Sequence, residues 1–251
     1  MDELLDNFLP ISLQEMEAVK LMNRIDTKFV ATPSRLEQLL QLLDGDYFIQ
    51  EIDGKRKMSY DTTYFDTDSF DMYNAHQTGR ANRQKLRFRT YVDTGIQFME
   101  VKTKNNHGRT KKKRIEVGDM SLDEARKAGF LHEFLHYEIC SLHPTIRNRF
   151  NRLTLVNRNK TERLTIDTDL YFHNLISGED VDMSDVVIIE LKREGLCPSP
   201  VLDKLRRLHI HPHGFSKYCM GSALTNSQLH VNRFKRNLIE INKIRRAICI
   251  F

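Results

Sequence analysis

The segment "RQKLRFRTYV", residues 83–92, carries a basic side chain at every second position. The basic residues are Arg83, Lys85, Arg87 and Arg89, and Leu86 and Phe88 stand between them. Side chains of a β-strand alternate between its two faces, so a strand here has one cationic face and one mostly apolar face. Either the cations face water, or they line an interior that only a polyanion would neutralise.

The same alternation recurs in residues 24–29, 98–104, 111–117, 163–170 and 186–194. A one-sided antiparallel sheet with solvated charges would show this pattern too. Two features favour an inward cationic face. Arg and Lys dominate the charged faces of four segments, where like charges on paired strands would repel, and several amphipathic helices need an apolar surface to cover. We therefore predict an α+β fold, with about eight antiparallel strands forming a barrel or tunnel with a basic lumen and helices outside.

Composition narrows the class of protein. The 251 residues hold 39 Lys and Arg against 34 Asp and Glu, which gives a formal net charge of +5. The four cysteines form no CxxC pair, the first ten residues are acidic rather than signal-like, and no apolar run is long enough to span a membrane. These features predict a cytoplasmic protein without a transmembrane segment. The positive excess is small and is not interleaved with base-stacking aromatics, so nucleic-acid binding is not expected.

The order of the expected elements mixes helices with strands. Helices are expected over residues 12–22, 32–43, 121–142, 199–209, 216–227 and 232–251. Strands are expected over 47–52, 57–66, 83–92, 96–104, 110–117, 149–157, 162–169 and 185–193. Thr32 and Pro33 suit a helix start, and Ser121 and Glu124 suit a capping box. The basic C-terminal helix within 226–251 is expected to dock through its apolar stripe, with a membrane surface or a partner protein as the alternative.

Eight segments, taken in order, resemble the VTC domain, the polyphosphate-polymerase domain of the vacuolar transporter chaperone complex, which also occurs in stand-alone bacterial proteins. They are "NRIDTKF" (23–29), "SYDTTYFDTDSFDMYNAH" (59–76), "RQKLRFRTY" (83–91), "FMEVKTK" (98–104), "KKKRIEV" (111–117), "ERLTIDTDL" (162–170), "IIELKR" (188–193) and "FSKYCMG" (215–221). The resemblance spans about residues 20–225 of one domain, 1–251. It implies the fold of the triphosphate tunnel metalloenzymes, an antiparallel β-tunnel lined by basic residues and glutamates.

The resemblance implies a metal-dependent transfer of the γ-phosphate of ATP to a growing polyphosphate chain, with Mn²⁺ or Mg²⁺ as cofactor. Phosphoryl transfer requires mainly positioning and charge neutralisation, which basic residues provide. The implied catalytic residues are Arg87, Arg89, Lys102 and Glu190. The implied phosphate-binding residues are Lys28, Arg83, Lys85, Lys104, Arg114, Arg152, Arg163, Lys192 and Lys217. Glu190 is the first choice of metal ligand, and Glu100 is either a second ligand or part of an ion pair.

Two departures and two alternatives accompany this interpretation. "RIDTK" (24–28) stands where related triphosphatases carry E-x-E-x-K, which disfavours simple triphosphate hydrolysis. Phe150 replaces a tyrosine usual in the family, which leaves the role of Arg152 open. The alternatives are a tri(poly)phosphate or NTP hydrolase of the same fold and a non-catalytic polyphosphate-binding module. The expected partners are ATP and polyphosphate, and coupling to export would need a partner membrane protein.

Overall fold

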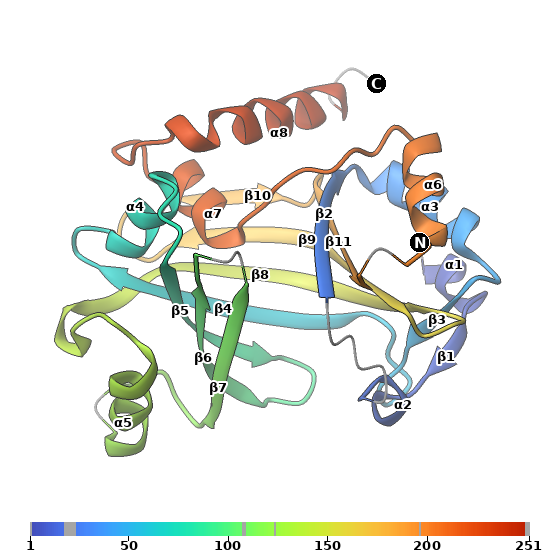
Figure 1. Ribbon diagram of the computed structural model, residues 1–251. Helices are drawn as coiled ribbons and strands as arrows, with labels where there is room; N and C mark the ends of the chain where they lie inside the picture. The colour runs from blue at the N-terminus through green and yellow to red at the C-terminus, as the bar shows by residue number, and fades with distance from the viewer. Residues whose placement is uncertain (1, 18–23, 107–108, 123, 196, 249–251) are drawn as a thin grey trace.

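The computed structural model describes residues 2–17, 24–106, 109–122, 124–195 and 197–248. Eight strands follow one another across a single curled sheet (Figure 1). In spatial order they are β2 (Arg24–Ala31), β11 (Val187–Glu194), β9 (Glu162–Asn174), β8 (Leu142–Asn157), β4 (Met58–Thr67), β5 (Arg83–Tyr91), β6 (Gln97–Lys104) and β7 (Thr110–Val117). All neighbours on this path are antiparallel. The shorter β1 (Leu9–Ile11), β3 (Tyr47–Gln50) and β10 (Asp180–Met183) extend the same sheet.

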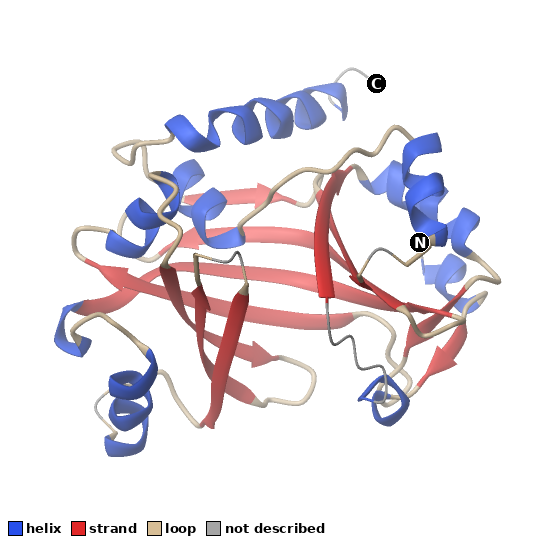
Figure 2. Cartoon of the chain, in the orientation of Figure 1, coloured by secondary structure: helices blue, strands red, loops and turns tan. Residues whose placement is uncertain are grey.

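The helices lie around this sheet (Figure 2). They are α1 (Asp2–Asp6), α2 (Leu13–Glu17), α3 (Pro33–Leu43), α4 (Asp71–Gln77), α5 (Ala125–Phe134), α6 (Pro200–Arg207), α7 (Lys217–Thr225) and α8 (Lys235–Ile248). Two 3₁₀ turns, η1 (Ile139–Ser141) and η2 (Asn232–Phe234), precede β8 and α8. None of the described helices is long and apolar enough to cross a bilayer.

The apolar faces of the strands pack under helices, as the alternation predicts. One core joins β8, β9 and β11 to α3, through residues that include Leu155, Ile166, Leu191 and Leu39. A second core joins Leu86, Phe88, Met99 and Val101 of β5 and β6 to Phe130 and Leu131 of α5. Burial of large aliphatic and aromatic side chains is the main favourable term in folding. The opposite, charged face of the same strands is therefore left to line the concave side of the sheet.

Helix α7 packs against part of this concave side. A Cβ atom on Gly221 would lie 2.4 Å from the ring of Phe172 on β9, so the close approach of helix and sheet requires glycine. One turn earlier, Tyr218 stacks on Tyr64 of β4 with ring centroids 5.2 Å apart. The start of α7 is thereby held over the charged half of the concave face.

This architecture confirms the predicted α+β class and the curled antiparallel sheet with helices outside. Within the described part of the chain, β2 and β7 end the eight-strand path and are not paired with each other, so the sheet forms a half-barrel. The helix expected at 32–43 is confirmed, and Thr32 Oγ1 accepts a hydrogen bond from the Arg35 backbone N–H at 3.2 Å. Of the helix expected at 12–22, α2 covers Leu13–Glu17, and residues 18–22 lie outside the described residues.

Three local predictions are wrong. The helix expected over 121–142 spans only Ala125–Phe134, because the chain turns at η1 and enters β8 at Leu142. The capping box does not form, since the carboxylate of Glu124 pairs with Lys127 at 3.1 Å. Strand β8 begins seven residues earlier than expected, because its first half is polar on its solvent side and interrupted by Pro144, which hides the alternation.

The C-terminal helix is shorter than predicted but docks as expected. It starts at Lys235 rather than at residue 232, because Asn232–Phe234 form the 3₁₀ turn η2. Ile241 is fully buried, and Leu238 and Ile244 pack on the core that includes Phe234. Arg245 Nε donates to Asp185 at 3.0 Å, which fixes the far end of α8 to the turn before β11. Residues 249–251 of the predicted helix lie outside the described residues.

Candidate active site in the basic lumen

Strand register places the predicted site residues on one face of the sheet. Arg87 lies opposite Tyr64 on one side and Glu100 on the other, and Glu100 lies opposite Arg114. At the other end of the sheet, Glu190 lies opposite both Lys28 and Thr165. We call this concave, charged face the lumen. It is formed by Lys28, Lys85, Arg87, Arg89, Glu100, Lys102, Arg152, Asp167, Glu190, Lys192 and Lys217.

Glu100 is the centre of a closed ion-pair cluster. Arg87 contacts its carboxylate through Nε at 2.6 Å and Nη2 at 2.5 Å, and Lys112 Nζ lies 3.1 Å from the other oxygen. The side chain of Glu100 is 0% exposed. Burial alone would raise the pKa of this carboxyl, but Arg87 and the neighbouring cations hold it well below its usual range. Both oxygens are engaged, so this geometry supports the ion-pair interpretation of Glu100 rather than the metal-ligand one.

Three lumen cations lack such a partner. Lys85 donates to the Ser216 hydroxyl at 2.8 Å, and Arg89 Nε donates to Thr62 Oγ1 at 3.3 Å. In the part of the chain that the structure describes, neither residue, nor Lys102, has a carboxylate within 4.0 Å. Proximity to Arg87 and burial lower the pKa of Lys102 well below its ordinary value, and burial lowers that of Arg89 to about 10. Arg89 is buried and Lys85 and Lys102 are half-buried, and cations in such positions are costly without a counter-charge, so the lumen is complementary to an anion.

The wall opposite is made by β8, β9 and the start of α7. Arg152 binds Asp167 through two hydrogen bonds of 2.6 and 2.8 Å, and Lys217 donates to the same carboxylate. Phe150 provides the surface beneath them, with Lys217 Nζ 4.1 Å from its ring centroid. Burial lowers the pKa of Lys217 to about 7, because the stabilising effect of Asp167 on the charged form is offset in part by nearby Arg152. Arg152 is thus held by a carboxylate and an aromatic floor.

Glu190 differs from Glu100 in being partly open. Lys192 Nζ lies 2.9 Å from one oxygen, Lys28 Nζ lies 4.0 Å from the other, and the side chain is 21% exposed. Burial lowers the pKa of Lys192 to about 8. No group of three potential metal-binding side chains occurs among the described residues. Glu190 therefore fits a Mg²⁺ or Mn²⁺ ion only as a single carboxylate ligand, with phosphate oxygens of a substrate as further ligands.

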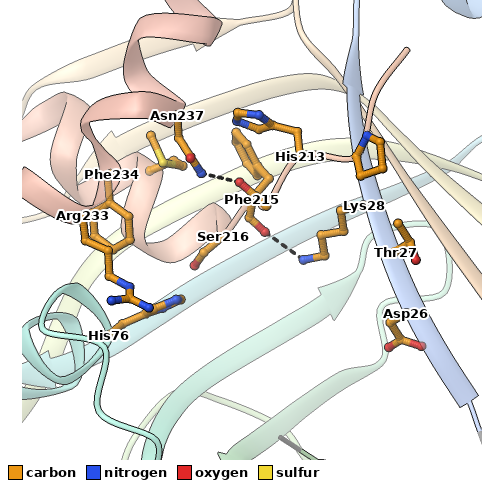
Figure 3. Close-up of a pocket in the computed structure, with 13 residues that line it drawn as sticks. Asp26, Thr27, Lys28, His76, His213, Phe215, Ser216, Arg233, Phe234 and Asn237 are labelled. Carbon is orange, nitrogen blue, oxygen red and sulfur yellow. Dashed lines mark hydrogen bonds between the residues drawn. The ribbon is translucent and has the colours of Figure 1, made fainter. Parts of the chain in front are cut away.

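The remaining predicted residues lie at the margins. Arg83 and Lys104 face each other at the end of β5 and β6 near α4, and Arg163 lies opposite Lys192. Arg114 is exposed on the edge strand β7, with its guanidinium 4.3 Å from the Phe98 ring centroid. Lys28 points from β2 toward the loop before α7 and donates to the Phe215 carbonyl at 2.8 Å (Figure 3).

Asp66 is a supporting residue that sequence reasoning missed. Its buried carboxylate accepts backbone N–H groups of Thr67, Met72 and Tyr73 at 2.8–2.9 Å, and it also accepts the Tyr218 hydroxyl. It therefore joins the start of α4 to α7 and helps to position Lys217. An aspartate at the end of a strand, directly before a turn, was the available signal in "YFDT".

A search of curated proteins found no match for this sequence. Several solved structures are similar in part. HpAC1 from Hippeastrum, provisionally named an adenylyl cyclase and described with a dominant triphosphatase activity, matches 80% of this chain and 95% of its own, at 15% identity and a TM-score of 0.49. A protein of Vibrio parahaemolyticus, provisionally named an adenylate cyclase, matches 80% of this chain and 99% of its own, at 11% identity and a TM-score of 0.46. A similarly named protein of Bacillus halodurans matches 85% of this chain and 100% of its own, at 16% identity and a TM-score of 0.44.

A comparison of the sequence with known protein families identifies the family of this chain. The VTC domain matches residues 23–226, which is most of the chain and includes all of the lumen strands. The matched range agrees closely with the extent of the eight segments that carry the resemblance. The chain therefore belongs to the VTC domain family.

Proposed function

We propose that the protein is a metal-dependent polyphosphate polymerase that transfers the γ-phosphate of ATP to a growing polyphosphate chain in the lumen. The observation that carries this proposal is the group of unpaired cations Lys85, Arg89 and Lys102 on one concave face. A linear polyphosphate has the charge density that would neutralise such a surface along its length. Membership in the VTC domain family supports the same substrate class.

The chain's own residues suit each part of the transfer. The bond between the γ-phosphorus and the β–γ bridging oxygen breaks, and a terminal oxygen of the acceptor chain forms the new P–O bond, which leaves ADP. Arg87 and Arg89 would hold the equatorial oxygens of the transferred group, because a guanidinium binds two oxygens at once. Lys102 would neutralise charge on the leaving oxygen. No nucleophilic side chain is needed, since the acceptor is itself a phosphate oxygen.

Two lysines are able to become protonated when phosphates bind. The pKa values of Lys217 and Lys192, about 7 and about 8, let both residues take up a proton near neutral pH when an anion arrives. Glu190 would hold the metal ion, which would supply positive charge to offset the repulsion between the phosphates.

The test is incubation of the purified protein with ATP, Mn²⁺ and a short polyphosphate primer, with products resolved on a gel and free phosphate and ADP measured. We expect a ladder of lengthening polyphosphate with an equal amount of ADP. Free phosphate without a ladder would replace the proposal with a triphosphatase. Neither product, together with protection of the protein against heat by polyphosphate, would indicate a binding module.

A further inference from the structure

A second cavity adjoins the lumen. It has a volume of about 560 Å³ and lies between β2, α4, the loop before α7, η2 and the start of α8 (Figure 3). We call it the outer cavity. Its polar lining includes Asp26, Lys28, His76, Ser216, Arg233 and Asn237. It communicates with the lumen at Ser216, whose hydroxyl accepts the hydrogen bond from Lys85, and at Lys28, which lies beside Glu190.

The side of the outer cavity around His76 is strongly cationic. Burial and the surrounding cations Lys85, Arg83, Arg233 and Lys104 lower the pKa of His76 to about 2, so this imidazole is neutral. Its Nδ1 lies 2.9 Å from the Cys219 sulfur. None of the four cations has a carboxylate within 4.0 Å among the described residues. Asp26, the one acidic residue of the lining, lies across the cavity on β2 (Figure 3).

Arg233 is exposed, and its side chain lies against α4. Its guanidinium lies over Gly79, where a Cβ atom would stand 2.4 Å from Nη1, and Gly79 also has a φ of +79° that favours glycine. The next residue, Phe234, is buried and packs edge-on against Tyr73 and His76. Arg233 lies beyond residues 23–226, so the VTC domain match does not include it.

We propose that η2 and α8 complete the outer cavity as a binding site for the part of a polyphosphate chain that extends beyond the reacting phosphates, with Arg233 as the outermost cation. The path runs from Lys102 past Lys85 to Arg83 and Lys104 and then to Arg233. A repeating anion matches this series of cations. The nucleoside of ATP fits less well, because the rings of Phe215 and Phe234 are buried and offer little surface for a base to stack on.

This inference rests on the proposed phosphate-binding lumen, and a binding experiment on the full chain separates the two. The affinities of tripolyphosphate, long-chain polyphosphate and ATP are measured by competition with fluorescently labelled long-chain polyphosphate, at one ionic strength and without metal. The variant is Arg233→Gln. The matched control is Lys243→Gln, which removes an exposed positive charge from α8 that is already paired with Glu240 at 3.1 Å.

We expect Arg233→Gln to weaken the binding of long-chain polyphosphate about fivefold, which is the size of effect expected when one exposed charge contact is lost. The affinity for tripolyphosphate should not change, because Arg233 is proposed to contact only the part of a chain that extends beyond the reacting phosphates. Lys243→Gln should change neither affinity. Equal weakening of the binding of all three ligands, or an unchanged affinity for the long chain, would overturn the inference. Neither result would contradict the proposed binding of phosphate in the lumen. Selective weakening of ATP would assign the cavity to the nucleoside instead. Failure of the wild-type protein to bind any of the three would overturn the proposed function as well.

Discussion

The two walls of the lumen come from the same alternating pattern but differ in how their charges are satisfied. On the β5–β6 wall, the carboxylate of Glu100 is fully buried and saturated by Arg87 and Lys112, while Lys85 and Lys102 have no carboxylate partner among the described residues. On the β9–β11 wall, Glu190 stays partly exposed beside Lys192. The comparison suggests a division of roles. The first wall has cations with no carboxylate partner among the described residues, and the second has a partly exposed carboxylate that is available to a metal ion.

The largest effect is expected from breaking the closed cluster. Arg87→Met would leave Glu100 buried with only Lys112, and losing one partner of a buried ion pair costs about 3–5 kcal/mol in the free energy of unfolding. Turnover should also fall at least about tenfold, since a two-point phosphate contact is lost. Urea unfolding and initial rates measure the two effects.

The double variant Arg87→Met with Glu100→Gln separates stability from catalysis. It removes the uncompensated carboxylate, so most of the stability should return while turnover stays low. Recovery of turnover together with stability would show that Arg87 acts only through folding.

The proposed role of Glu190 as a metal ligand is tested by measuring how activity depends on the Mn²⁺ concentration. Glu190→Gln should raise the Mn²⁺ concentration needed for half-maximal activity by about 10- to 100-fold, because a ligand oxygen loses its charge. Binding of tripolyphosphate measured without metal should not weaken. Glu100→Gln serves as the control, and its Mn²⁺ requirement should stay at the wild-type value. An equal shift in both variants would remove the distinction between the two walls.

Proton uptake on ligand binding reports on Lys217, the first residue of α7. The pKa of Lys217 is about 7 in the free protein, and a bound polyanion should raise it toward the ordinary lysine value. At pH 8 binding therefore takes up about one proton, and the affinity falls as the pH rises from 7 to 9. Calorimetry of tripolyphosphate binding in buffers of different ionisation enthalpy measures this uptake.

Lys217→Arg is the matched control for that titration. Arginine stays charged throughout this range, so proton uptake should decrease, while the contribution of the ligand's own ionisation stays the same. Unchanged uptake in the variant would exclude Lys217 as the group that titrates.

Period-2 alternation is a property of single strands, so the sequence predicted that Arg87, Lys102 and Glu190 lie on the charged faces of their strands. The direction of these faces was predicted from the predominance of Arg and Lys on them and from the amphipathic helices that need an apolar surface to cover. The second half of β8 was predicted, but its first half was missed because it is polar on its solvent side. Strands β1 and β10 were missed because they have only three and four residues. Helix α4 was missed because Phe70 at its N-cap makes no side-chain bond. Its first backbone N–H groups are instead bound by Thr67 and Asp66, which precede the turn before the helix.

The difference between Glu100 and Glu190 was also beyond the sequence. Both residues stand in alternating strands next to lysines, and their local contexts, "MEVK" and "IELK", are nearly the same. The two carboxylates differ in the residues that the neighbouring strands bring to them. Lys112 of β7 completes the cluster at Glu100, whereas the facing residue Thr165 of β9 leaves Glu190 partly open. The position of Arg233 beside the outer cavity was likewise not predictable from the sequence, because it depends on the path of the chain between α7 and η2.

The most direct test of the account is the stability of Lys102→Met with and without tripolyphosphate. Lys102 is half-buried beside the guanidinium of Arg87 and has no carboxylate partner in the described structure, so its removal should raise the free energy of unfolding in phosphate-free buffer by about 1 kcal/mol. The same variant should lose about the same amount of the stabilisation that tripolyphosphate gives to the wild-type protein. These opposite signs are the predicted result. A variant that is less stable without ligand, yet is stabilised by tripolyphosphate as much as the wild type, would contradict an anion-binding lumen.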